Sequence, residues 1–503
     1  MPEINETTNN GAFYLNNTVE PPRITKYTEM INSFKPYGIS CLLYGILFII
    51  SLYKGFHGIS MPVLCLATII GLYFIMKKLG IASKKTDWFY MTGIELLGIS
   101  CFLTGDMTLV FFNVCGIVLL IISFLLSRFC DTSGWGFPKY LKELINGIFV
   151  PVSYLDGFFK SLGHYFSKKE EKENSKAKYV WIGVLMGVPF VLIVTALLVS
   201  ADAVFGNIFK NLFSNIRFPQ RPVWLVILIL IGIPGTFGLL GYFADEKISG
   251  EVKEQRTWEP LIAITFLVFS TVVYLIFSMI QIKYLFIGGF TLPEGYTYAT
   301  YAREGFYQLL AVCLINLIVL FVCIGKFREN LILKTELTVF SVCTYIMLFS
   351  SLLRMVLYVK VYQLTYLRLL TLWGLLVIGI VLIGCLVTIW KNQFPLFPYV
   401  MVVVAVLYLA LSFARPGYVI AKYNLTDTGK EVQTDYNYIV DLNTDAVSVY
   451  LQSPQFDKKQ VSEYKEYKIE SYRQSADEMG ITDFNLSYYR TGRLIRKVYR
   501  TEE

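Results

Sequence analysis

The residues best placed for chemistry in this 503-residue chain are charged side chains within or beside long apolar runs. Burying a charge in a membrane is costly, so such residues mark ion paths, proton relays and ligand sites. A guanidinium pairs with two oxygens at once, which suits a phosphate or a carboxylate. A mainly basic group therefore predicts a site for an anionic group such as a lipid phosphate. Its members are Arg303, Glu304, Arg354, Lys360 and Arg368.

The same charges have an alternative, purely structural use. Arg354 lies inside an apolar run about one turn before its end, where snorkelling relieves the cost of burial only in part. It could pair with Glu304 or Asp202 and tie neighbouring helices together. The sequence leaves both interpretations open. The connection before Arg303, residues 288–302, is rich in Gly and Tyr and could form a structured lid.

Glu95 is the one acid inside another apolar run, TGIELLGIS. A proton or ion relay in a secondary transporter would place an acid there. An acid in such a position more commonly forms an interhelical hydrogen bond or is buried in its protonated form. Broken-helix signals, which mark many carrier sites, are limited to Pro189 and the Gly232–Gly235 run, and no matching pair occurs in two halves of the chain.

A membrane transferase acting on a lipid-linked substrate is a third possibility. It would need an acid at the outer face, and Asp106, Asp202 and Glu304 are the candidates. The chain has no Walker loop, HExxH or GxSxG motif. We therefore favour a protein that is not an enzyme, and we assign no catalytic residues.

The cysteines and histidines of the sequence give little support for a metal or cofactor site. The nine cysteines lie in or at the edges of apolar runs without a CxxC pair, which is typical of buried, inert thiols. His57 and His164 are the only histidines. We predict neither a metal site nor a cofactor. Asn424-Leu-Thr and Asn485-Leu-Ser match the acceptor pattern for N-glycosylation, a weak signal.

Composition indicates a membrane protein. Hydrophobic residues make up 55%, charged residues only 16%, and the mean hydropathy is +0.53, whereas soluble domains are about a quarter charged. The net charge of +8 comes from short connections between apolar runs, where it orients membrane helices. We expect membrane lipids as partners, anionic headgroups included, and no nucleic acid.

A spanning helix needs about 20 apolar residues. The apolar runs predict an all-α membrane protein with a bundle of about eleven spanning helices. These predicted spans are Tyr37–Tyr53, Ile59–Met76, Trp88–Thr104, Met107–Leu126, Tyr179–Ala203, Val223–Phe243, Pro260–Phe286, Phe306–Ile324, Leu333–Tyr358, Tyr366–Trp390 and Phe394–Phe413.

The chain divides into three parts. Residues 1–36 are polar and are predicted to be disordered, residues 37–414 form the transmembrane domain, and residues 415–503 form a small, mainly helical cap. Lys and Arg are concentrated in alternate connections, which predicts a cytoplasmic N-terminus and an extracytoplasmic C-terminus. Residues 137–166 have apolar side chains at helical spacing and predict an amphipathic helix at the cytoplasmic interface.

Three stretches carry a resemblance to a known family. They are Tyr284–Val312, Ser350–Leu376, and Arg415–Leu425 with Asp435–Leu451. Together they resemble bacterial multi-pass membrane proteins of the DUF4153 and DUF4173 families, which are domains of unknown function. The resemblance covers roughly residues 179–451 and implies a bacterial cell membrane location, but no reaction, substrate or site residues. Family members usually carry Asn-Pro where this chain has Arg415-Pro416.

We therefore expect a multi-pass bacterial membrane protein that acts as a sensor or scaffold, with an outward-facing basic site for an anionic group. The alternatives are a secondary transporter of a small solute and a membrane transferase. The sequence does not identify a ligand or an oligomeric state.

Overall fold

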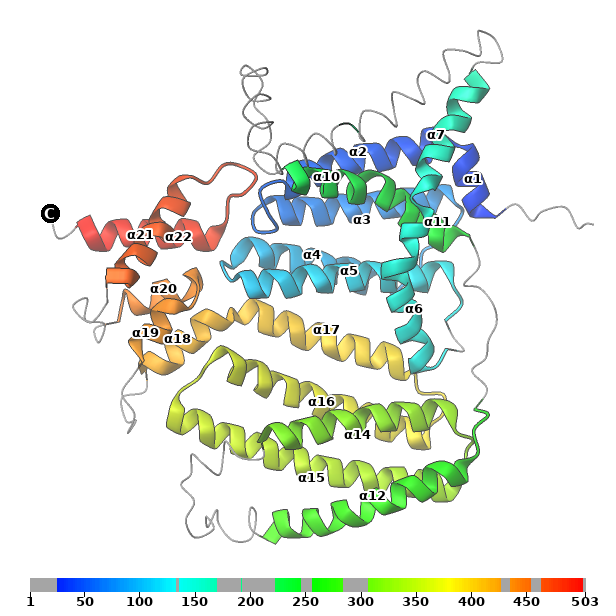
Figure 1. Ribbon diagram of the computed structural model, residues 1–503, viewed down its shortest axis with the longest axis vertical. Helices are drawn as coiled ribbons and strands as arrows, with labels where there is room; N and C mark the ends of the chain where they lie inside the picture. The colour runs from blue at the N-terminus through cyan, green and yellow to red at the C-terminus, as the bar shows by residue number, and fades with distance from the viewer. Residues whose placement is uncertain are drawn as a thin grey trace, which may run out of the picture.

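The structure is a computed structural model that describes most of the chain as helix. In the described part, helices run side by side and no strand occurs (Figure 1). A single isolated bridge joins Trp258 to Phe327 there. The described residues are 25–132, 135–169, 191, 222–245, 256–283, 306–426, 435–453 and 463–500.

The first group of membrane helices packs around one apolar core, which includes Cys41, Phe124 and Phe237. We call this group the first half-bundle. Its helices are α2 (Phe34–Leu52), α3 (Ser60–Lys78), α4 (Asp87–Leu103), α5 (Met107–Phe129), and an interrupted helix made of α10 (Pro222–Leu230), the π-helical turn η2 (Ile231–Gly235) and α11 (Thr236–Ala244).

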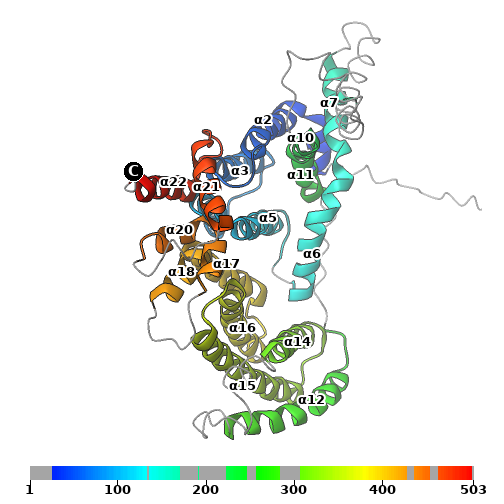
Figure 2. The same cartoon turned by 60° about the vertical axis from the view of Figure 1, so that its left-hand side comes forward.

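The second half-bundle has a separate core, which includes Leu320, Phe340 and Leu382. Its last helix, α17, packs apolar residues against both cores and lies between α5 and α16 (Figure 2). The helices of the second half-bundle are α12 (Pro260–Gln281), α14 (Phe306–Lys326), α15 (Leu331–Tyr362), α16 (Tyr366–Trp390) and α17 (Leu396–Ala414).

Every other predicted span coincides with one of these helices, whereas Tyr179–Ala203 lies outside the described residues except for Val191. Within the described residues, nine helices are long and apolar enough to cross a membrane. The exception among the predicted spans is α4, which has 17 residues and includes Asp87 and Glu95. The predicted fold class, an all-α membrane protein, is confirmed.

The Gly232–Gly235 run forms η2, with Pro234 inside the helix. Proline removes a backbone donor and clashes with the preceding turn, so it favours such an irregular turn. Gly45 of α2 lies directly against this turn. A Cβ on Gly45 would be 2.9 Å from the Gly232 backbone. The run that signals a broken helix in the sequence therefore allows two helices to approach closely.

Two helices cross the ends of the membrane helices instead of running parallel to them (Figures 1 and 2). They are α6 (Phe137–Phe149) and α7 (Asp156–Lys169), joined by the 3-10 turn η1 (Val150–Tyr154). The predicted amphipathic segment is thus helical but interrupted, because η1 contains a proline. On α6 the exposed side chains include Leu141, Ile145, Ile148 and Phe149, as expected for an interfacial helix.

A short helix, α1 (Lys26–Asn32), lies within the segment predicted to be disordered. The Thr25 hydroxyl accepts a hydrogen bond from the backbone of Thr28 and caps this helix. Met30 is completely buried in the first core. One buried side chain and one cap thus order a helix that hydropathy does not reveal. Residues 1–24 lie outside the described residues.

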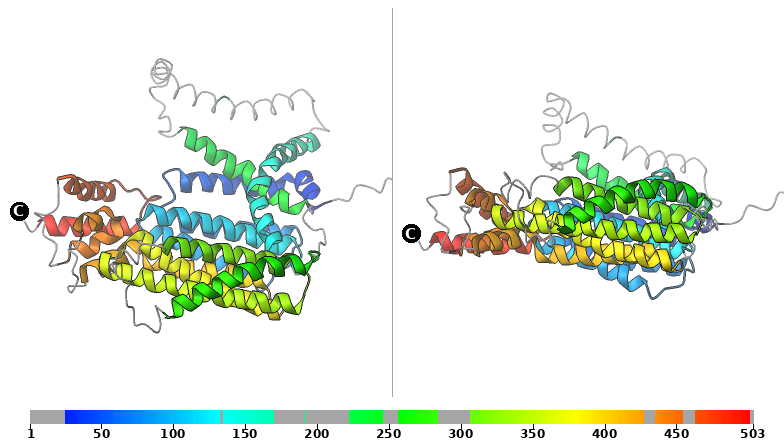
Figure 3. Two further views of the ribbon diagram at one scale, coloured as in Figure 1. Left: turned by 60° about the horizontal axis from the view of Figure 1, so that its bottom comes forward. Right: turned by 90° about the horizontal axis from the view of Figure 1, so that it is seen from below.

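The tail forms helices at the end of the bundle opposite α6 and α7 (Figures 1 and 3). It has a small core of its own, which includes Ala421, Ile439, Val447, Tyr450 and Ile495. The expected mainly helical cap is present. Its helices are α18 (Pro416–Thr426), α19 (Tyr436–Asp441), α20 (Thr444–Tyr450), α21 (Glu463–Asp477) and α22 (Leu486–Arg500).

The close approach of α2 to η2 yields a first prediction. Gly45→Ala should lower the midpoint of thermal unfolding, because the added methyl group overpacks the contact at a cost of about 1–3 kcal/mol. The matched control is Gly71→Ala in α3, where a Cβ meets nothing within 4 Å. That change should leave the midpoint equal or higher, since Ala favours helix over Gly. Equal losses in both variants would contradict the packing argument.

Candidate functional site

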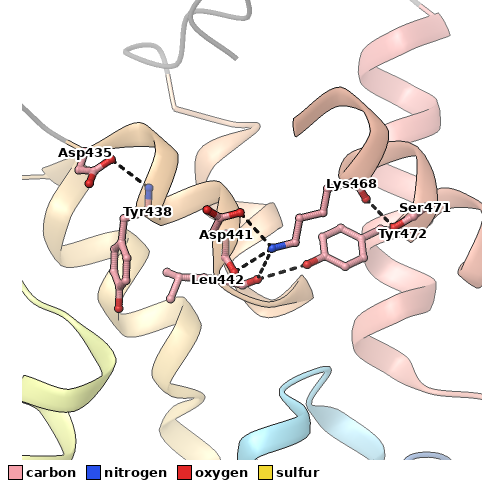
Figure 4. Close-up of polar contacts among 7 residues, drawn as sticks. All are labelled: Asp435, Tyr438, Asp441, Leu442, Lys468, Ser471 and Tyr472. Atoms are coloured by element: carbon pink, nitrogen blue, oxygen red, sulfur yellow. Dashed lines mark hydrogen bonds and ion pairs between the residues drawn. The ribbon is translucent and has the colours of Figure 1, made fainter. Parts of the chain in front are cut away.

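The tail is held together by contacts between α21 and the connection from α19 to α20 (Figure 4). The Lys468 ammonium donates to the Asp441 carbonyl at 2.8 Å and lies 3.4 Å from its carboxylate. The Tyr472 hydroxyl donates to the Leu442 carbonyl at 3.2 Å. Together with the core beneath them, these contacts allow the tail to dock as a unit.

Asn485 connects the tail to the first half-bundle. Its amide group donates to the carbonyls of Cys101 and Thr104, at 3.2 and 2.9 Å, at the C-terminal end of α4. Its carbonyl oxygen accepts hydrogen bonds from the backbone of Ser487 and Tyr488 and so caps α22. The last carbonyls of a helix have no partner within it. One fully buried side chain therefore completes the ends of two helices.

Asp445 of α20 binds the same α4–α5 turn. Its carboxylate accepts hydrogen bonds from the hydroxyls of Thr104 and Ser487, at 2.5 and 2.6 Å. Only 3% of Asp445 is exposed. A Cβ on Gly105, within the turn, would overlap the hydroxyl of Thr444. Residue 105 must therefore be a glycine for α20 to lie this close to the α4–α5 turn.

Asp106 places a second carboxylate beside Asp445. It caps α5 by accepting hydrogen bonds from the backbone of Thr108 and Leu109, at 3.0 and 3.1 Å. Burial raises the pKa of Asp106, an effect that the Leu109 N–H and the Tyr366 hydroxyl oppose and that the negative charge of Asp445 reinforces. The site therefore favours the protonated form of Asp106.

Asn424 of α18 connects the tail to the second half-bundle in a similar way. Its amide group donates to the Leu364 carbonyl at 2.9 Å, and its carbonyl accepts the Leu364 N–H at 2.8 Å. The Tyr438 hydroxyl accepts the N–H of Tyr366 at 2.8 Å. Both residues that match the glycosylation pattern, Asn424 and Asn485, thus have buried amides engaged in hydrogen bonds.

A polar cluster joins the two half-bundles between their helices. The hydroxyls of Tyr408 and Ser412, both on α17, donate to the Asn113 carbonyl oxygen of α5 at 2.8 and 2.9 Å. Ser100 of α4 lies 2.6 Å from the Ser412 hydroxyl. Asn113, Ser100 and Ser412 are buried. Such interhelical hydrogen bonds stabilise helix association where no hydrophobic force is available.

The predicted basic residues occupy different surroundings. Arg354 is buried on α15, with 8% exposed, and it is not an unpaired charge. Lys360 is exposed on the same helix. Six residues separate the two, so α15 directs them to different faces. Arg303 and Glu304, like Asp202, lie outside the described residues.

Arg368 completes the end of a helix. Its guanidinium donates to the carbonyls of Tyr362, at 2.6 Å, and Gln363. It also lies 4.2 Å from the ring centre of Tyr358. Gln363 follows the last residue of α15 and has a positive φ of 69°. The last carbonyls of a helix have no hydrogen-bond partner within it. Arg368 supplies hydrogen-bond donors to these carbonyls, so its guanidinium stabilises the end of α15.

Glu95 is partly buried on α4, which packs against both α3 and α5. Its Oε2 atom is buried and has no hydrogen-bond partner among the described residues. The predicted relay residue thus lies at a helix contact within the first half-bundle.

A polar cavity of about 480 Å³ lies between the α2–α3 turn and the tail. The Lys54 ammonium forms an ion pair with Asp483 at 3.0 Å at its edge. His57 and Glu478 also line it. Lys54 and His57 are more than 400 positions away in the chain from Glu478 and Asp483, and nothing in the sequence distinguishes any of them from other surface residues. No local pattern could have grouped them.

Comparison with known families decides the membership of the chain. The model of a domain of unknown function, DUF4153, matches residues 91–452. The chain belongs to the DUF4153 family. No curated protein and no solved structure matches it.

The DUF4153 match begins inside α4 and ends just after α20. It includes Asn424 and Asp445 of the tail, together with the two turns that they bind. It ends before α22, which carries Ser487 and follows Asn485. In this DUF4153 protein, the docking of the tail therefore combines residues inside the matched region with residues beyond it.

The raised pKa of Asp106 predicts a pH dependence. The folded protein binds this proton more tightly than the unfolded chain, whose Asp pKa is about 3.9. The cost of ionising Asp106 is absent below that value, develops as pH rises toward the folded pKa, and is complete above it. Asp106→Asn keeps a capping oxygen. It should raise the unfolding midpoint at pH 7 and flatten the decline of the midpoint that begins as pH rises above about 4.

Asp106→Ala is the control for the cap itself. It removes the charge and the capping oxygen together, which should cost about 1 kcal/mol relative to Asp106→Asn. The neighbouring titratable groups, Asp445 and Tyr366, are the same in both variants. An unfolding midpoint for Asp106→Asn that falls with pH as steeply as that of the unmodified protein would rule out Asp106 as the source.

Proposed function

We propose that this multi-pass membrane protein is a non-enzymatic sensor or scaffold in which the tail clamps the two half-bundles together. The observation that carries the proposal is the pair of buried asparagines. Asn485 binds the α4–α5 turn of the first half-bundle, and Asn424 binds the α15–α16 turn of the second. One small folded unit thus holds a turn of each half-bundle.

The energetics of the clamp suit a sensor. Away from the tail, the two half-bundles meet largely through α17, which packs against α4, α5 and α6. A buried hydrogen bond contributes about 0.5–1.5 kcal/mol net, so the clamp contacts together amount to a few kcal/mol. A ligand that alters them can shift a two-state equilibrium by a similar amount. Binding at the tail would then change the arrangement of the membrane helices.

The proposal keeps an outward-facing basic site for an anionic group. Arg354 is its main described member, because α15 directs Lys360 to another face and the guanidinium of Arg368 is used at the end of α15. Arg303 and Glu304, the other predicted members, lie outside the described residues. We further propose a bacterial plasma membrane location with a cytoplasmic N-terminus and an extracytoplasmic tail. The concentration of Lys and Arg in the connections on the side opposite the tail supports this orientation.

The transferase alternative is less well supported. Of its candidate acids, Asp106 uses one carboxylate oxygen as the N-cap of α5. A catalytic acid needs a carboxylate within reach of the substrate, whereas only 4% of Asp106 is exposed.

The clamp can be tested by removing its buried carboxylate. Asp445→Ala leaves the hydroxyls of Thr104 and Ser487 without their acceptor, at a cost of about 1–3 kcal/mol for each unsatisfied donor. Spin labels at Ile70 of α3 and Val273 of α12, both exposed, would report the separation of the half-bundles. We expect a narrow distance distribution in the unmodified protein and a broader one in the variant.

The matched control for this experiment is Asp477→Ala. Asp477 also forms an ion pair in the tail, with Arg496 at 2.6 Å, but both side chains are about half exposed. Its loss should cost about 0–1 kcal/mol and leave the distribution narrow. The clamp is refuted by an Asp445→Ala protein whose distribution matches that of the control.

The basic site has a separate test. Hydrogen–deuterium exchange at the tail-side end of α15 should slow when phosphatidylglycerol is added, and Arg354→Ala should abolish this protection because it removes the bidentate donor. Lys78→Ala, an exposed cation at the other end of the bundle, is the control. Protection that persists in Arg354→Ala would count against an anionic group at this residue.

A further inference from the structure

A second cavity lies at the opposite end of the bundle from the tail. Its volume is about 450 Å³. One wall comes from α6, through Phe137 and Tyr140, and from Trp135 two residues before it. The other wall comes from the second half-bundle, through Phe321 and Phe397. Because α6 crosses the ends of the membrane helices, the cavity is at the level of the membrane interface.

Stacked aromatic rings build this cavity. The rings of Phe137 and Phe321 are 3.9 Å apart and nearly parallel. Those of Tyr140 and Phe397 have the same separation. The Tyr140 hydroxyl also donates to the Thr132 carbonyl at 3.0 Å. Aromatic side chains are enriched at headgroup level, where one end is apolar and the other wet. The walls therefore match the polar boundary of a bilayer.

The cavity also carries positive charge. Arg256 lines it and donates through Nη1 to Glu329 and Asn392, both at 3.2 Å. Glu329 also accepts from the Lys334 ammonium at 2.9 Å. The hydrogen bonds from Lys334 and Asn392 lower the pKa of Glu329, so it is ionised. Two cations then share one carboxylate, which leaves an excess of positive charge.

The guanidinium of Arg256 has N–H donors that its hydrogen bonds to described residues do not use. A guanidinium has five N–H donors, and among the described residues both hydrogen bonds of Arg256 use Nη1. Nε and Nη2 can therefore donate hydrogen bonds to two oxygens of one phosphate. A second cation, Lys139, lies 4.4 Å from the ring centre of Trp135 in the cavity wall. This combination of a guanidinium, an ammonium and aromatic rings is complementary to a phosphate at the membrane surface.

The surroundings favour a lipid as the source of that phosphate. Leu141, which follows Tyr140 of the cavity wall on α6, is exposed, and so is Ile145 about one turn further on. On α14, Leu314, Ile315 and Ile318 are exposed as well. Acyl chains attached to a headgroup in the cavity would lie along these apolar surfaces. A free phosphate ion would use none of them.

We propose that this cavity binds the phosphate headgroup of an anionic phospholipid, with Arg256 as its main ligand. The bound lipid joins α6 to the second half-bundle at the end opposite the clamp. This site is separate from the outward-facing site at Arg354, and it stands whether or not the clamp acts as a sensor.

Native mass spectrometry of the full-length protein with phosphatidylglycerol tests the proposal. Arg256→Gln should weaken binding at one site about tenfold, the factor expected when charge-assisted hydrogen bonds are lost. Arg256→Lys keeps the positive charge but loses the planar guanidinium that donates to two oxygens at once, so the affinity of this variant for the lipid should be intermediate. Arg496→Gln is the matched control, because it removes an arginine that also pairs with a carboxylate, that of Asp477 at the tail end.

Two outcomes would overturn the proposal. The first is phosphatidylglycerol binding that is unchanged in both Arg256 variants, or lost equally in Arg496→Gln. The second is inorganic phosphate that competes with the lipid at equal concentration, which would assign the cavity to a free anion. Phosphatidylcholine, whose headgroup has no net charge, should bind equally to all variants.

Discussion

Hydrogen bonds from two asparagine side chains connect the tail to the membrane helices. A helix that crosses a membrane satisfies its own backbone except at its ends. Asn485 supplies donors to the end of α4, and Asn424 pairs with both backbone groups of Leu364 after α15. The turns between spans are thus completed by residues of the tail. Because the same tail completes a turn in each half-bundle, its docking and the arrangement of the membrane helices depend on each other.

This dependence is strengthened by the narrow direct contact between the half-bundles. Each has its own apolar core, and α17 is the described helix that contributes to both. There the hydroxyls of Tyr408 and the buried Ser412 donate hydrogen bonds to Asn113. In a bilayer, burial of apolar surface adds little to helix association, so a few polar contacts determine much of the preference for one arrangement of the helices. The tail at one end and α6 at the other therefore have a large share in setting the geometry.

The membrane helices were predictable from the sequence, but the clamp was not. Hydropathy found the boundaries of α16 because spanning a bilayer imposes a length and a composition. Arg368 looked like a ligand residue because hydropathy cannot tell a charge facing a site from one that caps a helix. Asn424 and Asn485 matched a modification pattern, whereas their role depends on turns far away in the chain. In the sequence, Asp445 cannot be distinguished from a surface acid, because its partners, including Thr104, are far away in the chain.

The point where the tail begins shows how local backbone chemistry enters the clamp. Arg415 ends α17 in the left-handed region, with φ of 53°. Asn adopts this region more readily than residues with long side chains do, so the backbone of Arg415 is strained here. In this chain the guanidinium of Arg415 lies 5.4 Å from the ring centre of Tyr418 in α18. That cation–π contact, of about 0.5–1 kcal/mol at an exposed site, offsets part of the strain. The reversal that carries α18 toward Leu364 is thus set by backbone conformation at the junction, with the side chain adapted to it.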